Sequence, residues 1–136
     1  MKRLVLLCIL SFSLWSCSLE NDTANFYNEF VPVESVTIPE SFTYGVVHSI
    51  SFSYYRPSTC HFFQDLYYVA EDNTRTIAVI NTVYEESDCE LLVDNLIERT
   101  FDFKPMEYGT YVFKFWTGVD ENDVDEFITF EIVVAE

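Results

Sequence analysis

The segment YGTYVFKFW at residues 108–116, together with EFITFEIVV at residues 126–134, decides the fold class. In the first segment every second residue is aromatic, namely Tyr111, Phe113 and Phe115. The second segment carries apolar residues at every second position in the same way. A period of two places these side chains on one face of a β-strand. The two segments therefore predict an antiparallel hairpin with one apolar face.

Two registers of this hairpin fit the sequence. One places Phe115 opposite Ile128, and the other places Phe115 opposite Phe130 and Lys114 opposite Glu131. Both registers join the same two apolar faces, so the hairpin is expected in either case.

The other strands are predicted from alternation, from dense aromatic residues and from the scarcity of Gly and Pro. They lie at residues 31–38, 46–55, 60–70, 75–84 and 97–103. Pro32 keeps the first of them at a sheet edge, because proline cannot donate to a β-ladder. Four polar residues at 71–74 suit a hairpin turn. About seven short strands predict an all-β fold, an antiparallel two-sheet sandwich in which each strand buries one face.

Residues 46–55 alternate most clearly. Val46, Ile50, Phe52 and Tyr54 are expected in the core, and the serines between them are expected to face water. His48 lies in the same row, where we expect a strand-end or hydrogen-bonded core histidine rather than a catalytic base or a metal ligand.

The first 16 residues carry the pattern of a signal peptide. Lys2 and Arg3 precede the apolar stretch 4–14, which is shorter than the ~20 residues that a membrane-spanning helix needs. The sequence LWSC, which ends at Cys17, resembles the lipobox of bacterial lipoproteins. This resemblance implies cleavage before Cys17 and attachment of lipid to it. The alternative is an ordinary secretory signal with an incidental cysteine.

This reading divides the chain into a signal peptide at residues 1–16, a lipidated cysteine and flexible tether at 17–30, and a sandwich domain at 31–136. Ser18 is not the aspartate that resembles an inner-membrane retention signal of enteric bacteria, which favours the outer membrane. The segment around Thr23 resembles the O-glycosylation motif of Bacteroidota.

The charge of the mature chain excludes one class of partner. Without Lys2 and Arg3, five basic residues stand against 23 acidic ones, a formal charge of −18. Binding to nucleic acid and to anionic lipid headgroups relies on Lys and Arg that neutralise phosphate. We therefore expect no nucleic-acid partner.

The segment GTYVF at residues 109–113 resembles the tyrosine-corner segment of immunoglobulin-like domains, with Phe113 at the position where antibody domains carry cysteine. The chain is in this respect similar to the small immunoglobulin-like lipoproteins of Bacteroidota. That resemblance implies an immunoglobulin-like sandwich, and no activity that the group has in common.

Two cysteines are left to pair. Cys8 leaves with the signal peptide and Cys17 receives lipid, so Cys60 and Cys89 are expected to form a disulfide outside the cytoplasm. Closing the loop between them is worth about 3.6 kcal/mol in the chain-entropy model. The alternative is a pair of buried free thiols.

The sequence offers little for catalysis. No Gly-x-Ser-x-Gly, His-Glu-x-x-His or phosphate-loop motif occurs. His61 follows Cys60 and is expected to face solvent beside the disulfide, and a zinc site at these residues lacks any recognised ligand spacing. We expect a protein that is not an enzyme and has no cofactor.

An acidic segment joins the last two strands. Asp120, Asn122, Asp123 and Asp125 are weak candidate ligands for calcium, which favours carboxylate and carbonyl oxygens in a loop. The EF-hand pattern fails, because Val124 stands where a ligand is needed. The other interpretation is a solvated loop of mutually repelling charges.

Trp116 and Phe127 lie on the opposite parity from the apolar rows, so both are expected to face outward. Exposed apolar patches often mark contact sites, and a flat ring can stack on a sugar or anchor a protein. The alternative is a purely structural role, in which the two rings cover each other as a cross-strand pair.

Two functional classes remain. The first is a membrane-anchored envelope lipoprotein that acts as a non-catalytic binding module for a protein or a glycan. The alternative is an accessory or divergent glycan hydrolase that uses carboxylates.

Overall fold

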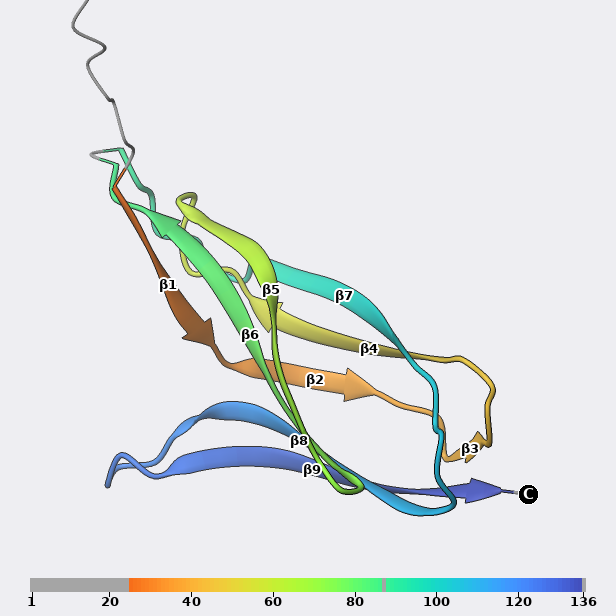
Figure 1. The fold of residues 1–136 in the computed structure, drawn as a ribbon. Helices are drawn as coiled ribbons and strands as arrows, with labels where there is room; N and C mark the ends of the chain where they lie inside the picture. Colours follow the sequence, from red (N-terminus) through yellow and green to blue (C-terminus); the bar gives the residue numbers. More distant parts are fainter. Residues whose placement is uncertain (1–24, 87, 136) are drawn as a thin grey trace, which may run out of the picture.

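The computed structural model describes residues 25–86 and 88–135, and in these ranges the chain forms β-strands and no helix (Figure 1). The strands are β1 (Phe26–Val31), β2 (Val33–Thr37), β3 (Ser41–Thr43), β4 (His48–Tyr55), β5 (His61–Glu71), β6 (Thr74–Tyr84), β7 (Leu96–Phe103), β8 (Gly109–Val119) and β9 (Asp125–Ala135). One sheet has six strands, and the other has three in the order β2-β4-β7. The predicted all-β fold with two sheets is confirmed.

The described part of the chain has nine strands rather than about seven. The short strand β3 was not predicted. β1 begins at Phe26, inside the segment 17–30 that was expected to be the tether. This boundary was wrong because β1 is held by pairing with β6, for example Val31 with Val79, and a partner so distant in the sequence leaves no local signal.

Strand β6 organises the large sheet. β5 pairs along one edge of β6 over nearly its whole length. The opposite edge is divided between two strands: β1 pairs with residues 79–84, and β8 pairs with residues 74–77. β9 then pairs with β8, and β3 with β9. The ends of β1 and β8 therefore meet on one edge of β6.

The large sheet contains parallel and antiparallel pairs, whereas the sequence predicts antiparallel pairs alone. β6 pairs with β8 in parallel, and so does β3 with β9. Parallel neighbours need a crossover connection, and between β6 and β8 the chain passes through β7 of the other sheet. Alternation of side chains identifies a strand, but it carries no information about the direction of its neighbours.

Pro32 is the point at which the chain changes sheets. Val31 pairs with Val79 in the large sheet, and Val33 pairs with Tyr54 in the small one. A residue without an N–H suits this break between two ladders. The predicted strand 31–38 is divided at Pro32: Val31 ends β1, and the remainder is present as β2, which lies at a sheet edge as expected.

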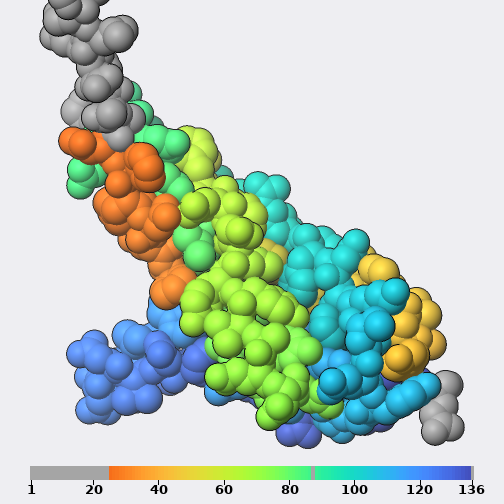
Figure 2. Space-filling model, in the orientation of Figure 1, coloured from red at the N-terminus to blue at the C-terminus, as the bar shows by residue number. Residues whose placement is uncertain are grey.

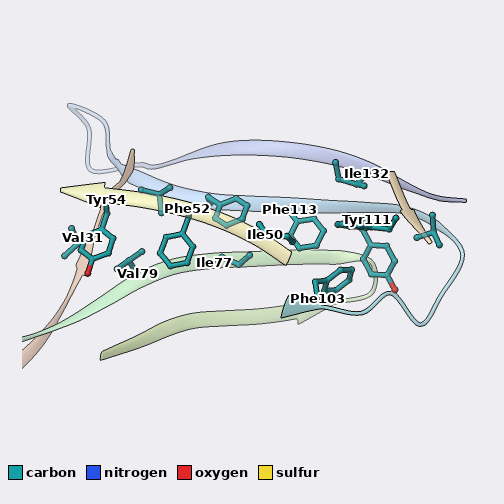
Figure 3. Packing of buried hydrophobic residues seen from close by; sticks show 14 residues of the cluster. Val31, Ile50, Phe52, Tyr54, Ile77, Val79, Phe103, Tyr111, Phe113 and Ile132 are labelled. Atoms are coloured by element: carbon teal, nitrogen blue, oxygen red, sulfur yellow. The ribbon is translucent and has the colours of Figure 1, made fainter. Parts of the chain in front are cut away.

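The core lies between the two sheets and is rich in aromatic rings (Figure 3). Its most buried large side chains come from both sheets and include Phe42, Ile50, Tyr54, Ile77, Tyr111, Phe113 and Phe115. Full burial of one Phe side chain contributes roughly 1.5–3 kcal/mol to the free energy of unfolding. The predicted inward rows of β4 and β8 are confirmed, except that Val46, before β4, is 48% exposed and Ser53, which was expected to face water, is buried.

Both predicted hairpins are present. β8 and β9 pair in the first of the two registers, with Phe115 opposite Ile128. β5 and β6 are joined through Asp72 and Asn73, and Asp72 adopts the left-handed conformation with a φ of 49°. Aspartate tolerates this conformation better than most residues.

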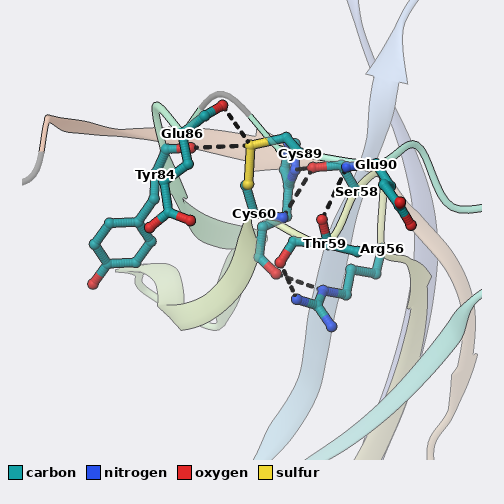
Figure 4. Close-up of a disulfide and its surroundings, with 9 residues drawn as sticks. Arg56, Ser58, Thr59, Cys60, Tyr84, Glu86, Cys89 and Glu90 are labelled. Carbon is teal, nitrogen blue, oxygen red and sulfur yellow. Dashed lines mark hydrogen bonds between the residues drawn. A yellow bond between two sulfur atoms is a disulfide. The ribbon is translucent and has the colours of Figure 1, made fainter.

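The predicted disulfide between Cys60 and Cys89 is confirmed (Figure 4). Backbone hydrogen bonds surround it, among them Thr59 N to Glu90 O at 2.9 Å. The carbonyl oxygen of Glu86 lies 3.2 Å from Cys89 Sγ, which is a contact only, since a disulfide sulfur carries no proton. The bridge ties the turn before β5 to the segment before β7.

The predicted signal peptide, Cys17 and Thr23 lie outside the described residues. Within the described residues, no helix has the length and apolar character needed to cross a membrane.

Candidate functional site

Aromatic side chains gather on the outer face of the large sheet. The registers place these residues on the side opposite the core: Phe26, Phe30, Phe62, Tyr67, Tyr84, Trp116 and Phe127. Phe30 and Tyr67 are about half exposed, at 49% and 45%. Such a dense aromatic face on a domain of this size is a candidate contact surface.

A groove with a volume of about 270 Å³ indents this face. It is lined by Phe30 of β1, Tyr67 of β5, Thr76 and Ala78 of β6, Trp116 of β8, and Asp125 and Phe127 of β9. Figure 2 shows the end of the β8–β9 hairpin projecting away from the rest of the domain, with a notch between it and β1. We call the cavity lined by these residues the aromatic groove.

The groove exists because β1 and β8 part at this point. β1 leaves the large sheet at Pro32, whereas β8 continues past it, and the Cβ that Gly118 lacks would lie 3.9 Å from Pro32 Cγ. Gly118 has a φ of 122° and follows a register shift after Trp116. That conformation favours glycine, so a β-bulge redirects the hairpin here.

Ring contacts form the walls of the groove. The ring centre of Phe30 lies 5.5 Å from that of Tyr67 and 5.9 Å from that of Trp116. Lys114 Nζ lies 4.5 Å from the centre of the Phe127 ring, a cation–π contact. These neighbours leave Trp116 and Phe127 half-buried rather than fully exposed.

One carboxylate is held at the rim of the groove. The indole Nε1 of Trp116 donates to Asp125 Oδ1 at 2.8 Å. The bond fixes the indole plane and leaves the second oxygen of Asp125 as an acceptor. The site thus combines flat apolar rings with an oriented polar group.

Sequence reasoning found Trp116 and Phe127, and the structure pairs them directly across β8 and β9 on the outer face. It missed Phe30 and Tyr67. Phe30 lay in the segment that was assigned to the tether. Tyr67 lies beyond a register shift between Phe63 and Asp65, which disrupts the alternation of β5.

A second, more open hollow lies at the disulfide end of the same face. It has a volume of about 580 Å³, and Phe62, Thr82 and Tyr84 are among its lining residues. The ring of Tyr84 also contacts Phe26 at 5.9 Å between centres. The aromatic face therefore extends beyond the groove.

His61 does not face solvent as expected, and its side chain is only 12% exposed. Nδ1 lies 2.7 Å from Ser58 Oγ, and Nε2 lies 2.7 Å from Glu29 Oε1. A serine, a histidine and a carboxylate in this sequence of contacts also occur in hydrolytic triads. Here, however, Ser58 is only 5% exposed, and its Oγ already accepts the N–H of Cys60 at 3.2 Å. The arrangement therefore ties β1 to the disulfide turn.

His48 has the role that the sequence predicts for it. Its Nε2 accepts a hydrogen bond from the backbone N–H of Thr43 at 2.9 Å, and its ring packs on Phe42 with 4.9 Å between centres.

The acidic loop is organised by Asp120. Its Oδ1 accepts the backbone N–H groups of Asn122 at 2.7 Å and Val124 at 3.0 Å. These bonds hold the pKa of Asp120 below its usual value. Asp120, Asp123 and Asp125 do not gather as metal ligands, and nowhere in the described ranges do three acidic, His or Cys side chains do so.

Comparison with known proteins gives no relative: no family model, no curated protein and no solved structure matches this chain.

Proposed function

We propose that this chain is a lipid-anchored lipoprotein of the bacterial outer membrane, and that its domain is a non-catalytic module that binds a neutral glycan in the aromatic groove. The observation that carries the proposal is the concave site in which Phe30, Tyr67, Trp116 and Phe127 meet beside the oriented carboxylate of Asp125. Small-ligand sites are typically apolar cavities with a few well-placed polar groups.

The chemistry of the groove suits a sugar. The rings offer flat surfaces for the C–H faces of a sugar ring, and the free oxygen of Asp125 can accept a hydrogen bond from a hydroxyl group. A formal charge of −18 on the mature chain opposes acidic polymers. A neutral glycan meets both conditions.

The groove favours binding over turnover. Glycoside hydrolases of the common classes place two carboxyl groups on either side of the scissile bond. Asp125 is the one carboxylate among the residues that line the groove. An accessory or divergent hydrolase therefore remains the weaker alternative.

An immunoglobulin-like fold is part of the proposal. In support, the hydroxyl of Tyr111 accepts the backbone N–H of Glu107 at 3.2 Å, a contact of the tyrosine-corner kind. The order β2-β4-β7 also resembles the A-B-E order of immunoglobulin sheets. The parallel pairing of β6 with β8 departs from that pattern.

The fluorescence of Trp116, which lines the groove, can report binding there. The chain has two tryptophans, and Trp15 leaves with the predicted signal peptide. We expect neutral oligosaccharides of glucose, mannose, galactose or N-acetylglucosamine to change the fluorescence of Trp116 in a saturable manner. The double variant Tyr67→Thr, Phe127→Thr should bind at least about tenfold more weakly, since two ring contacts are lost.

The matched control is Tyr108→Thr, which removes an exposed aromatic ring outside the groove. It should bind as the unaltered protein does, and all proteins should melt at similar temperatures. Fluorescence that no sugar in the panel changes, or equal binding by the double variant, would contradict the proposal. Release of reducing ends from the same sugars would favour the hydrolase.

A further inference from the structure

A third, smaller cavity lies next to the disulfide turn and is lined by residues of both sheets. It has a volume of about 100 Å³. Tyr54 of β4 and Arg99 of β7 line it, together with Arg56, which follows β4, and Phe63 of β5. Two of the five basic residues of the mature chain therefore share one cavity.

Arg99 lies in an unusual position for a charged residue. It alternates with Ile97 and Phe101, both of which pack against the core, and it pairs with the buried Phe52 of β4. Its guanidinium carbon lies 5.2 Å from the centre of the Phe63 ring. The side chain is thus directed along the inner face of the small sheet toward the cavity.

The side chain of Arg56, which also lines the cavity, is held by hydrogen bonds to backbone carbonyl groups. Its Nε donates to His61 O and its Nη2 to Thr59 O, both at 2.6 Å, and its guanidinium carbon lies 4.8 Å from the Phe62 ring centre. The turn that provides these carbonyl groups is tied by Cys60 to the rest of the domain (Figure 4). Two of its five N–H donors are used, and three are left for a ligand.

Neither guanidinium has a carboxylate partner among the residues that the structure describes. The single ion pair within 4.0 Å there joins His61 and Glu29. The chain has 23 acidic residues, so partners for Arg56 and Arg99 would be easy to provide. Two like charges in one cavity repel each other, and a bound anion would remove that repulsion.

Tyr54 adds a neutral donor to the cavity. Burial raises the pKa of its hydroxyl, and the positive charges of Arg99 and Arg56 partly offset this rise. Tyr54 lines the same cavity as both guanidinium groups. That hydroxyl stays protonated at neutral pH and can donate a hydrogen bond to an anion.

We propose that this cavity binds a single carboxylate group carried by an otherwise uncharged molecule. Arginine binds carboxylates through parallel N–H bonds, and the small volume suits one such group. The large negative charge of the domain disfavours phosphate, which carries more charge. A uronic acid residue of a glycan and the C-terminus of a peptide both provide this chemistry. The inference does not depend on the aromatic groove.

Thermal unfolding of the full-length protein tests the proposal, because a ligand that binds the folded state raises the melting temperature. The probes are sodium glucuronate and sodium N-acetylglycinate. Their neutral counterparts, glucose and N-acetylglycinamide, and inorganic phosphate serve for comparison, with ionic strength held constant by sodium chloride. We expect at least one carboxylate to raise the melting temperature by more than its neutral counterpart does, so that any binding of a neutral sugar in the aromatic groove is subtracted. Which carboxylate acts distinguishes a sugar acid from a peptide end.

The test variant is Arg99→Gln, because Arg99 is exposed to solvent and its loss should leave the fold intact. Its affinity for the active carboxylate should fall about tenfold or more. Lys104→Gln is the matched control, since it removes one positive charge from an exposed position that does not line the cavity. No response to either carboxylate, a stronger response to phosphate, or an equal response in Arg99→Gln would overturn the proposal.

Discussion

At the scale of single residues, polar groups inside the sandwich are the informative exceptions. Asn81 is fully buried, and neither polar atom of its side chain has a hydrogen-bond partner in the described part of the protein. It lies between Glu29 of β1 and Phe63 of β5 on the inner face of the large sheet. A buried amide without partners costs about 1–3 kcal/mol. Asn81 therefore lowers the stability of the domain relative to an apolar residue at this position.

We predict that Asn81→Leu stabilises the domain. The substitution conserves most of the volume and removes two unpaired polar groups, so the free energy of unfolding should rise by about 1 kcal/mol. Chemical denaturation measures the change. Asn28→Leu, at an exposed position on β1, should alter the value by less than about 0.5 kcal/mol. A less stable Asn81→Leu protein would mean that the amide is hydrogen-bonded in solution.

At the scale of elements, one end of the β8–β9 hairpin is packed in the core, and the conformation of the other end depends on the turn that joins the two strands. The rows of Phe113 and Phe115 anchor one end in the core. Beyond Gly118 the hairpin projects from the body, and Asp120 organises the turn through two backbone N–H groups (Figure 2). The position of Asp125 at the groove thus depends on a turn that its own charges tend to open.

The pKa of Asp120 predicts how this turn responds to acid. Because that pKa is lower in the folded protein, the carboxylate stabilises the turn above its unfolded pKa, near 3.8, and the stabilisation is lost as pH falls through the lower folded value. The amide resonances of Asn122 and Val124 should therefore shift only below about pH 4 in an NMR titration.

The matched variant is Asp120→Asn, which keeps the acceptor oxygen and removes the titrating group. In this variant the two amides should not respond to acid. A transition of unchanged size in Asp120→Asn, or a midpoint above 3.8 in the unaltered protein, would assign the titration to another carboxylate.

At the scale of the whole molecule, the aromatic groove and the disulfide lie on different parts of the described domain, and the cavity lined by Arg56 and Arg99 lies next to the disulfide turn. β1 connects them, since it borders the groove through Phe30 and reaches the disulfide turn through Glu29 and His61. β1 is also the first strand after the segment that is proposed to end in lipid. A short tether would therefore hold the disulfide end of the domain close to the membrane.

We predict that Cys17→Ser abolishes membrane attachment. In detergent phase partitioning of cells that produce the protein, the unaltered chain should enter the detergent phase, because the lipoprotein pathway adds the two or more acyl chains needed for stable anchoring. The Cys17→Ser chain should enter the aqueous phase. Cys8→Ser is the control and should behave as the unaltered chain does. A Cys17→Ser protein in the detergent phase would exclude lipid on this residue.

The sequence by itself determined the class of fold, the inward rows of β4 and β8, both hairpins and the pairing of Cys60 with Cys89. These features follow from a local period of two, from turn chemistry and from the small number of cysteines. Trp116 and Phe127 were found for the same reason, since the parity of a regular strand assigns each residue to a face.

Only the tertiary structure decided the strand β1, the parallel pairs, the aromatic groove and the cavity lined by Arg56 and Arg99. β1 and the parallel neighbours depend on partners that are distant along the chain, and no local period reports them. Phe30 joins the groove where β1 changes sheet, and Tyr67 joins it after a bulge in β5. Arg56 and Arg99 share a cavity because β4 pairs with β7, which is distant along the chain. Long-range pairing has no signature in a local pattern, and these candidate binding sites are made by such pairing.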